Sequence, residues 1–285
     1  MTWRLRLAEL GGAASTRQLR AAGATDRALS AAVVSGELLR PRNGRYVVPA
    51  AGESLLAAVA LGARLSCVSA ARTYGLWGGE DARTHLVVPP KAGRSGAGDP
   101  GVVRHWRPCH DHAEIWRVSL ADCLHTVGRC ADQETAVAVF DTAISTGRIT
   151  RHGLQHVFAQ EPRRSRDRAA LARPGSESGV ESLLRQRLSA RGHLIEQQVF
   201  VPGVGTVDFR VDGVLFVEVD GFLFHSDRLA FAHDRKRDTA MTLRGERRLR
   251  FSAGEVISRG EDVVDTIEAV LDRTKREEER ALRRG

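Results

Sequence analysis

The chain has 285 residues and a mass of 31.1 kDa, which is too long for one ordinary domain and sufficient for two or three. Hydrophobic residues make up 42% and charged residues 27%, a balance typical of globular proteins that excludes a disordered or fibrous chain. No apolar run is long enough to span a bilayer, and charged residues interrupt the first residues before a signal-peptide core could form. We therefore expect a cytoplasmic protein with no membrane segment.

The chain is strongly basic. Lys and Arg number 43 against 35 acidic residues, which gives a net charge of +8, and the isoelectric point is near 10.1. This charge suits a polyanionic partner such as nucleic acid. The only lysines are Lys91, Lys236 and Lys275, and such an arginine-rich composition is also typical of a GC-rich genome. The positions of the arginines therefore decide between the two explanations.

The four cysteines form no Cys-x-x-Cys pair and all lie between Cys67 and Cys130, which argues against a disulfide framework. The sequence Cys-His-Asp-His at 109–112, followed by Cys123, His125 and Cys130, contains the residue types that bind zinc. A zinc site needs close ligand pairs held by tight turns, however, and these residues are spread over expected loops and strands. We therefore favour buried thiols and surface histidines over a zinc site.

Residues 1–49 predict three short helices followed by a hairpin. Ser15 and Gln18 have the spacing of a capping box, which indicates the start of the second helix, and Thr25 caps the third. Asn43-Gly44 lies between two short strands, and this dipeptide is the strongest short hairpin signal. Three short helices and a basic hairpin predict a winged helix-turn-helix domain.

The predicted winged helix contains residues suited to DNA. Arg27 and Ser30, on the exposed side of the third helix, would read bases in the major groove, while Arg40, Arg42 and Arg45 on the wing would contact phosphates. The alternative is a module for protein contacts whose arginine-rich wing is simply solvated. In helix lengths, glycine positions and the end of the wing, the region resembles the N-terminal domain of AbiE-type (type IV) antitoxins.

Residues 50–160 predict an α/β middle domain without a catalytic constellation. We expect an alanine-rich helical stretch at 57–71 that is interrupted around residues 65–66, a strand at 84–89 and an amphipathic helix at 133–146. The region also resembles the body of AbiE-type antitoxins, in which a segment like that at 69–76 recurs. We interpret it as a scaffold or as the surface for a protein partner, such as a toxin or a repair factor.

A charged segment with two prolines, residues 161–176, predicts a linker to a C-terminal α/β domain at 177–274. In that domain a strand that is apolar on both faces ends abruptly at Glu218 and Asp220. Asp208 lies on the preceding strand and His225 follows shortly after.

These grouped carboxylates predict a metal site. Carboxylates close together are costly unless a hard cation neutralises them, and Mg²⁺ or Mn²⁺ placed there would polarise a phosphodiester and activate water. His225 would then serve as general acid or base. The alternative is that the acids only end strands and cap turns.

The hairpin that carries the acids sets a geometric condition. A two-residue turn at Asp212-Gly213 pairs Asp208 with Val217 and puts Asp208 and Glu218 on opposite faces of the sheet. A shared metal site therefore requires a bulge or a three-residue loop, because either one shifts the strand register by one residue and puts both acids on the same face.

The C-terminal pattern resembles the PD-(D/E)xK endonuclease superfamily. The order is a helix with Glu181, then Asp208, then Glu-x-Asp-Gly-Phe-x-x-His from Glu218 to His225, then an Asp-Arg-x-x-Asp helix. Over residues 177–272 this order is most similar to the Vsr-like branch, which includes the very-short-patch-repair mismatch endonucleases. The resemblance implies a restriction-endonuclease-like α/β fold.

The resemblance also implies roles for the site residues. Asp208 and Glu218 would bind the metal, Glu181 would support the site, and His225 would transfer the proton. Asp220 stands where the superfamily usually has lysine and where Vsr enzymes have histidine. The missing lysine bears on activity rather than on fold, because the attacking water loses its usual cationic partner.

Other C-terminal features have simpler alternatives. Glu181 lies three residues after Ser178, the spacing of a capping box, so it could merely close a helix end. The helix expected at 226–244 carries Arg235 and Arg237, which the resemblance favours as phosphate contacts, although nearby aspartates could pair with them on a solvated face. Residues 275–285 are expected to be a frayed tail.

The leading hypothesis is a multi-domain α/β DNA endonuclease that uses Mg²⁺ or Mn²⁺ and is targeted by a winged helix, with Asp220 assisting the metal site. The alternative is an antitoxin-type, DNA-binding transcriptional regulator with a catalytically inactive nuclease fold. A third hypothesis is an adaptor that binds a toxin through residues 50–160.

Overall fold

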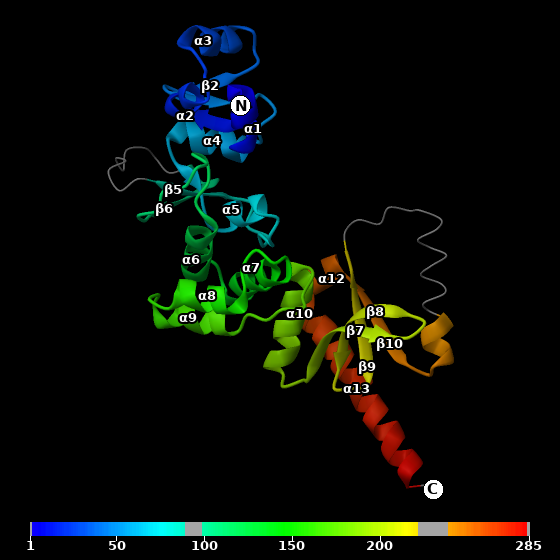
Figure 1. Cartoon of the computed structure of the whole chain (residues 1–285). Helices are drawn as coiled ribbons and strands as arrows, with labels where there is room; N and C mark the ends of the chain where they lie inside the picture. The colour runs from blue at the N-terminus through cyan, green and yellow to red at the C-terminus, as the bar shows by residue number, and fades with distance from the viewer. Residues whose placement is uncertain (1, 89–98, 222–238, 284–285) are drawn as a thin grey trace. The chain divides into compact units, whose positions relative to one another are not determined.

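The structure, a computed structural model, describes three stretches of the chain: residues 2–88, 99–221 and 239–283 (Figure 1). The chain divides into two compact units, the first made of Met1–Val139 and Gln155–Ala170, the second of Phe140–Leu154 and Leu171–Gly285. Both units combine helices with sheet, so the protein is mixed α/β, as predicted. Among the described residues, no helix has the length and apolar character needed to cross a membrane.

The first unit begins with short helices around a small antiparallel sheet of order β1-β3-β2. These elements are α1 (Trp3–Glu9), β1 (Ala13–Ser15), α2 (Thr16–Ala21), α3 (Asp26–Val34), β2 (Leu39–Arg42) and β3 (Arg45–Val47). The capping box of Ser15 and Gln18 is present, the Thr25 hydroxyl accepts the amide of Ala28, and Gly44 makes the turn with a φ of 73°. The helix starts and the hairpin predicted here are confirmed.

This part is fixed to a later segment of the same unit. The indole N–H of the buried Trp116 donates to the carbonyl of Leu10 at 2.8 Å, and Gln18 Nε2 donates to the carbonyl of Ala113 at 2.6 Å. Gly11 has a φ of 73°, and a Cβ on it would lie 2.8 Å from the Trp116 ring. Glycine is therefore needed at this position both for the backbone conformation and for the close approach.

The rest of the first unit is a sheet of order β4-β5-β6 with helices around it, in which β4 is antiparallel to β5 and β5 is parallel to β6. Its elements are α4 (Glu53–Leu61), β4 (Arg64–Leu65), α5 (Cys67–Thr73), β5 (Thr84–Val88), β6 (Val102–Trp106), α6 (Leu120–Cys130) and α9 (Arg163–Ala170). Helix α9 lies within the stretch 161–176 that the sequence assigns to a linker. The boundary between the units falls within α7 (Gln133–Ser145) and α8 (Arg151–Phe158).

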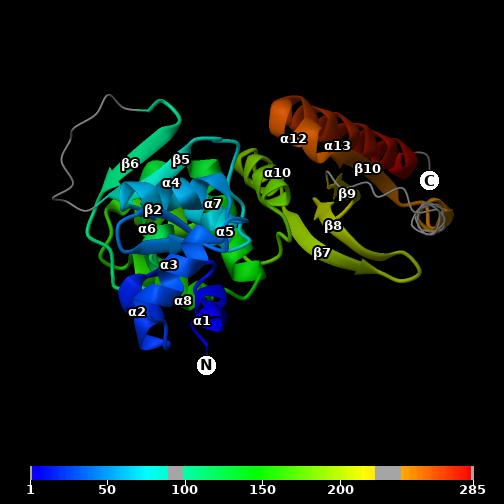
Figure 2. The ribbon, with the colours of Figure 1, turned by 90° about the horizontal axis from the view of Figure 1, so that it is seen from above.

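The second unit contains a four-stranded sheet of order β10-β9-β8-β7, antiparallel except for the parallel pair β9 and β10. Its further elements are α10 (Gly179–Ala190), β7 (Ile195–Val201), β8 (Gly205–Val211), β9 (Leu215–Asp220), β10 (Arg247–Ser252), α12 (Ala253–Ser258) and α13 (Gly260–Leu282). Figure 2 shows α12 and α13 alongside this sheet. Helix α13 runs to Leu282, so most of the tail expected to fray is helical.

Strand β8 has one apolar and one polar face. Val207, Phe209 and Val211 are fully buried, while the residues between them, including Asp208, are only half-buried. Because side chains alternate along a strand, Asp208 lies on the less buried face of β8.

A buried carboxylate links α7 to α10 within the second unit. Asp141 accepts hydrogen bonds from Ser182 Oγ at 2.6 Å, Arg185 Nη2 at 2.8 Å and the backbone amide of Arg173 at 2.7 Å. Asp141, Ser182 and Arg185 are all buried, so the ion pair is shielded from water.

Replacing Asp141 tests this link. Asp141→Ala leaves Arg185 buried without its carboxylate, and we expect the free energy of unfolding of the second unit to fall by about 3–5 kcal/mol. Urea unfolding combined with amide hydrogen exchange in α10 measures the change. The control is Asp167→Ala, which removes an exposed partner 3.7 Å from Arg163 and should change stability by less than about 1 kcal/mol. Equal losses in both variants would contradict the role of Asp141.

Candidate functional site

The turn between β8 and β9 decides which carboxylates share a face. The register pairs Phe209 with Val217, so the turn contains the three residues 212–214 rather than two. Asp208 precedes Phe209 and Glu218 follows Val217, and side-chain alternation therefore puts both acids on the other face of the sheet. The condition that the sequence set for a shared site is met.

The turn is held in an unusual conformation. Asp212 and Gly213 have φ values of 51° and 74°, in the left-handed region. Asp212 Oδ1 accepts the amide of Leu194 at 3.0 Å, and its Oδ2 lies 2.9 Å from His193 Nδ1. Burial by itself raises the pKa of Asp212, but these hydrogen bonds outweigh it and hold the pKa below its usual value. The bonds stabilise the ionised carboxylate and with it the turn.

Asp208 lies against the end of β9. Its Oδ2 accepts the backbone amide of Val219 at 2.8 Å, which places the carboxylate beside the segment that carries Glu218 and Asp220. Glu218 is only 6% exposed, whereas Asp208 and Asp220 are half-buried. The three acids singled out in the hairpin are thus brought together.

Glu181 joins this group from the first turn of α10. Ser178 Oγ accepts the amide of Glu181 at 3.2 Å, but Glu181 Oε2 accepts the amide of Glu177 at 2.9 Å, so the capping box is only half formed. Gln198 Nε2 donates to the same oxygen at 3.4 Å. Burial, together with the negative charge of Asp208, raises the pKa of Glu181 to about 7.

Two arginines of β10 balance part of this charge. Glu218 Oε2 accepts hydrogen bonds from Arg248 Nη1 at 2.9 Å and Arg250 Nη2 at 3.0 Å, and Arg250 Nε lies 3.6 Å from Asp220 Oδ2. The parallel register pairs Arg250 with Glu218 directly. Sequence reasoning did not connect these arginines with the acids, because the pairing depends on which strand lies beside β9.

The residue types present fit a divalent cation. Among the described residues, five carboxylates and three guanidinium groups lie at this face, because Arg210 and its partner Glu196, 3.0 Å apart, share it with the groups named above. The carboxylates therefore outnumber the guanidinium groups. Mg²⁺ is usually held by one or two carboxylates plus water and phosphate, and Asp208 and Glu218 supply such a pair from neighbouring strands. His225, Arg235 and Arg237, which the sequence also assigns to this site, lie outside the described residues.

In the first unit, the residues expected to read DNA are at the surface. Arg27 and Ser30 are both exposed on α3. Arg40 is also exposed, is hydrogen-bonded to the side chain of Asn43 and lies 5.7 Å from the centre of the Tyr46 ring.

The other two wing arginines are closer to the body of the unit. Arg42 Nη1 donates to the carbonyl of Ala60 at 3.4 Å. Arg45 is half-buried, and burial together with the positive charges of Arg64 and Arg42 lowers its pKa. Arg45 thus lies near both Arg42 and Arg64 of β4, and the sequence did not single out Arg64.

Two cavities run along this basic region. One has a volume of about 550 Å³ and is lined in part by Arg17, Arg45, Arg64 and Asp111. A second, of about 340 Å³, shares Arg45, Arg64 and Asp111 and adds Arg107. We refer to these two cavities together as the basic groove.

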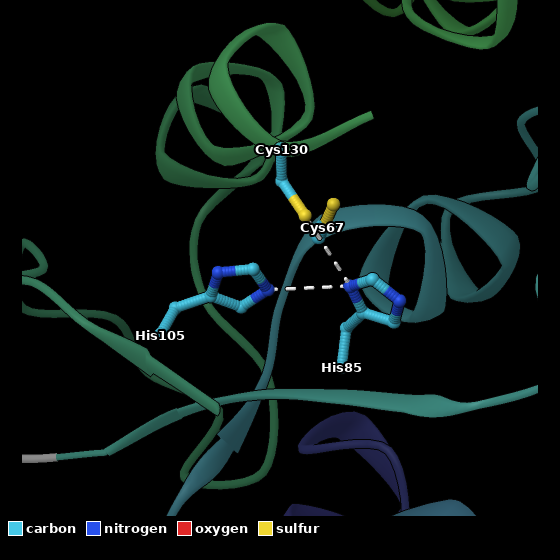
Figure 3. Close-up of side chains that lie close together, drawn as sticks. All are labelled: Cys67, His85, His105 and Cys130. Carbon is cyan, nitrogen blue, oxygen red and sulfur yellow. Dashed lines mark hydrogen bonds between the residues drawn. The ribbon is translucent and has the colours of Figure 1, made fainter. Parts of the chain in front are cut away.

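Four side chains that the sequence did not connect meet elsewhere in the first unit (Figure 3). Cys67 begins α5, His85 lies on β5, His105 on β6, and Cys130 ends α6. One ligand atom from each lies within 4.8 Å of the other three. His85 Nδ1 is 3.2 Å from His105 Nε2 and 3.9 Å from Cys130 Sγ. In the described part of the chain this is the one group of three or more such residues so close together.

Of the residues that the sequence analysis weighed for zinc, only Cys130 belongs to this cluster. Cys109 is exposed, His110 Nδ1 lies 2.9 Å from Asp122, and His125 Nε2 lies 2.6 Å from the carbonyl of Val157. Each member of the cluster sits on a different element, so no short spacing in the sequence could have indicated it.

The raised pKa of Glu181 predicts how stability depends on pH. A carboxyl whose pKa rises on folding, here from 4.5 to about 7, binds more protons in the folded state, so stability falls as the pH rises through that interval. In the presence of EDTA we expect Glu181→Gln to remove a decline of roughly 1.4 kcal/mol per pH unit. Urea unfolding at several pH values measures it. The exposed Glu196→Gln serves as control, and an unchanged decline in Glu181→Gln would contradict the assignment.

No protein-family model matches the chain, and no curated protein matches it in sequence. The function is therefore inferred from the geometry of the site.

Proposed function

We propose that this chain is a DNA-binding, divalent-metal-dependent endonuclease that hydrolyses phosphodiester bonds. The observation that carries the proposal is the sheet face on which Asp208, Glu218 and Asp220 adjoin Glu181. The order of α10, three antiparallel strands and a fourth strand parallel to the third supports the expected likeness to the Vsr-like PD-(D/E)xK nucleases.

In this proposal, acidic residues of the second unit would bind the cation, and other residues of the same site would transfer a proton during hydrolysis. Asp208 and Glu218 would hold Mg²⁺ or Mn²⁺ with the help of Asp220, and the ion would supply a Lewis acid for the phosphate and lower the pKa of a bound water. Glu181, with a pKa of about 7, can hold or release a proton near neutral pH. His225 is proposed as the general acid or base on the basis of the resemblance.

The first unit supports the DNA-binding half of the proposal. Arg45 and Arg64 line the basic groove, and the positive charges of Arg64 and Arg42 act against that of Arg45. A phosphate placed in the groove would relieve that repulsion. Arg27 and Ser30 are exposed on α3, as residues that read base edges must be. The predicted winged helix would thus present both backbone and base contacts.

A specific observation favours a second candidate function. Arg248 and Arg250 both hydrogen-bond Glu218, and Asp220 replaces the lysine that most of the superfamily uses. A cation must compete with two guanidinium groups for that carboxylate. An antitoxin-type transcriptional regulator, in which this domain serves only as a binding platform, accounts for the arrangement. A protein partner such as a toxin would then bind through residues 50–160.

Removing the proposed metal ligand tests the enzyme. Asp208→Asn keeps an oxygen that can accept the amide of Val219 but loses the charge, so we expect the fold and DNA affinity to persist. The rate of nicking of plasmid and mismatched duplex in Mg²⁺ or Mn²⁺ should fall by more than about 100-fold. A loss of that size exceeds the effect of residues that only support metal ligands.

Two comparisons make this test decisive. Asp262→Asn, an exposed acid on α13, should cleave like the wild type. Unchanged nicking by Asp208→Asn would contradict the metal site and indicate a contaminating nuclease. Absence of cleavage in every variant, with DNA binding retained, would favour the regulator.

The basic groove predicts how DNA affinity depends on salt. Each phosphate contact contributes about −0.9 to the slope of log affinity against log salt, so Arg45→Ala combined with Arg64→Ala should flatten it by up to about two units. Because phosphate contacts carry no sequence information, all duplexes should weaken alike, whereas Arg27→Ala should alter sequence preference. Fluorescence anisotropy over a range of KCl concentrations measures both effects.

The control for this experiment is Arg163→Ala, an exposed arginine of α9 outside the basic groove. It should leave the slope within error of the wild type. If the double variant and the control have the same slope, phosphates do not bind at the groove.

A further inference from the structure

We infer that Cys67, His85, His105 and Cys130 form a structural zinc site in the first unit. Two cysteine thiolates and two imidazoles are a common ligand set for structural zinc, and four protein ligands leave no position open for substrate. Figure 3 shows the two sulfur atoms and the two rings directed toward a common point. This inference is independent of the proposed nuclease activity.

The distances between ligand atoms agree with a tetrahedral site. The edge of a tetrahedron is about 1.63 times its centre-to-corner distance, so usual Zn–N and Zn–S lengths give N–N edges of about 3.3 Å and N–S edges of about 3.6 Å. The observed separations are 3.2 Å between His85 Nδ1 and His105 Nε2 and 3.9 Å between His85 Nδ1 and Cys130 Sγ. These two separations are close to the expected edges, and all four ligand atoms lie within 4.8 Å of one another.

The surroundings of His85 orient its ring for a metal. Its Nε2 lies 3.1 Å from Asp81 Oδ2, and Arg83 contacts both oxygens of that carboxylate, at 2.9 and 2.7 Å. The two hydrogen bonds from Arg83 leave the Asp81 carboxylate to act as an acceptor toward His85. The proton of His85 then sits on Nε2, and the lone pair of Nδ1 points into the cluster. A carboxylate bonded to the outer nitrogen is the usual support of a zinc-bound histidine.

The backbone of Cys67 has a strained conformation of the kind found at functional sites. Cys67 is fully buried and has a φ of 50°, a conformation that is unfavourable for a residue with a side chain. Its carbonyl accepts a hydrogen bond from Cys123 Sγ at 3.3 Å, and the amide of His85 donates to Ser69 Oγ at 2.9 Å. Contacts around the cluster therefore hold Cys67 and His85 in place.

The ligand set selects zinc rather than the Mg²⁺ proposed for the second unit. Thiolates and imidazoles in tetrahedral S₂N₂ geometry suit zinc, whereas Mg²⁺ prefers oxygen ligands. A zinc ion here would join two helix ends, α5 and α6, to the neighbouring strands β5 and β6. Its main effect is therefore on the stability of the first unit.

Metal analysis of the full chain, purified from zinc-supplemented medium, tests the site. We expect about one zinc per chain, and a loss of at least tenfold in zinc retained against a chelator for Cys130→Ser and for His105→Ala. The matched control is Cys109→Ser, which removes an exposed cysteine of the same unit and should retain zinc like the wild type. Zinc absent from the wild type, or lost equally in Cys109→Ser, would overturn the inference.

A second measurement does not depend on whether the ligand variants fold. Cobalt replacing zinc should give the d–d bands of tetrahedral cobalt and thiolate charge-transfer absorption, and His105→Cys should keep the ion while raising the charge-transfer intensity. Thiol titration of the denatured wild type should find all four cysteines reduced. A Cys67–Cys130 disulfide in place of bound metal, or a cobalt spectrum without thiolate bands, would overturn the zinc site.

Discussion

The length of one turn decides which carboxylates of the second unit lie on the same face of the sheet. The turn 212–214 joins β8 to β9, and the side chains on these strands alternate between two faces. With one residue fewer, Asp208 would fall opposite Val217, and Asp208 and Glu218 would lie on opposite faces of the sheet. The left-handed backbone of Asp212, held by His193 and Leu194, thus keeps Asp208 and Glu218 on the same face.

The acids on this face of the sheet repel one another, and their negative charge is offset in different ways. Glu181 carries a raised pKa because it is buried beside Asp208, while Glu218 is neutralised by Arg248 and Arg250. Two ways of offsetting buried negative charge, protonation and ion pairing, therefore operate on the same face. A bound cation would be a third way to offset the charge, but it would have to displace the guanidinium groups from Glu218. The balance between them would distinguish the proposed nuclease from the proposed binding platform.

The proposed zinc site and the basic groove share structural elements. His85 and His105 lie on β5 and β6, and Val87, Val88 and Arg107, which lie on or directly after these strands, line the groove. Fixing the two strands to α5 and α6 would therefore also fix the walls of the groove.

The sequence by itself determined the local features of this protein. Capping residues such as Ser15 and Thr25, the Asn43-Gly44 turn and the acids that end β9 were all predicted, because each depends on neighbours a few residues away. The mixed α/β class followed from the same local patterns. The roles assigned to His225, Arg235 and Arg237 stay predictions.

Only the tertiary structure decided which of these features meet. It set the three-residue turn, placed Arg248 and Arg250 beside Glu218, and brought together Cys67 and three ligands from separate elements. Spacing along the chain carries no record of such contacts, since each depends on which strand or helix packs beside another. The physical reason is that caps and turns are stabilised within one or two turns of backbone, whereas a site is formed by the packing of whole elements.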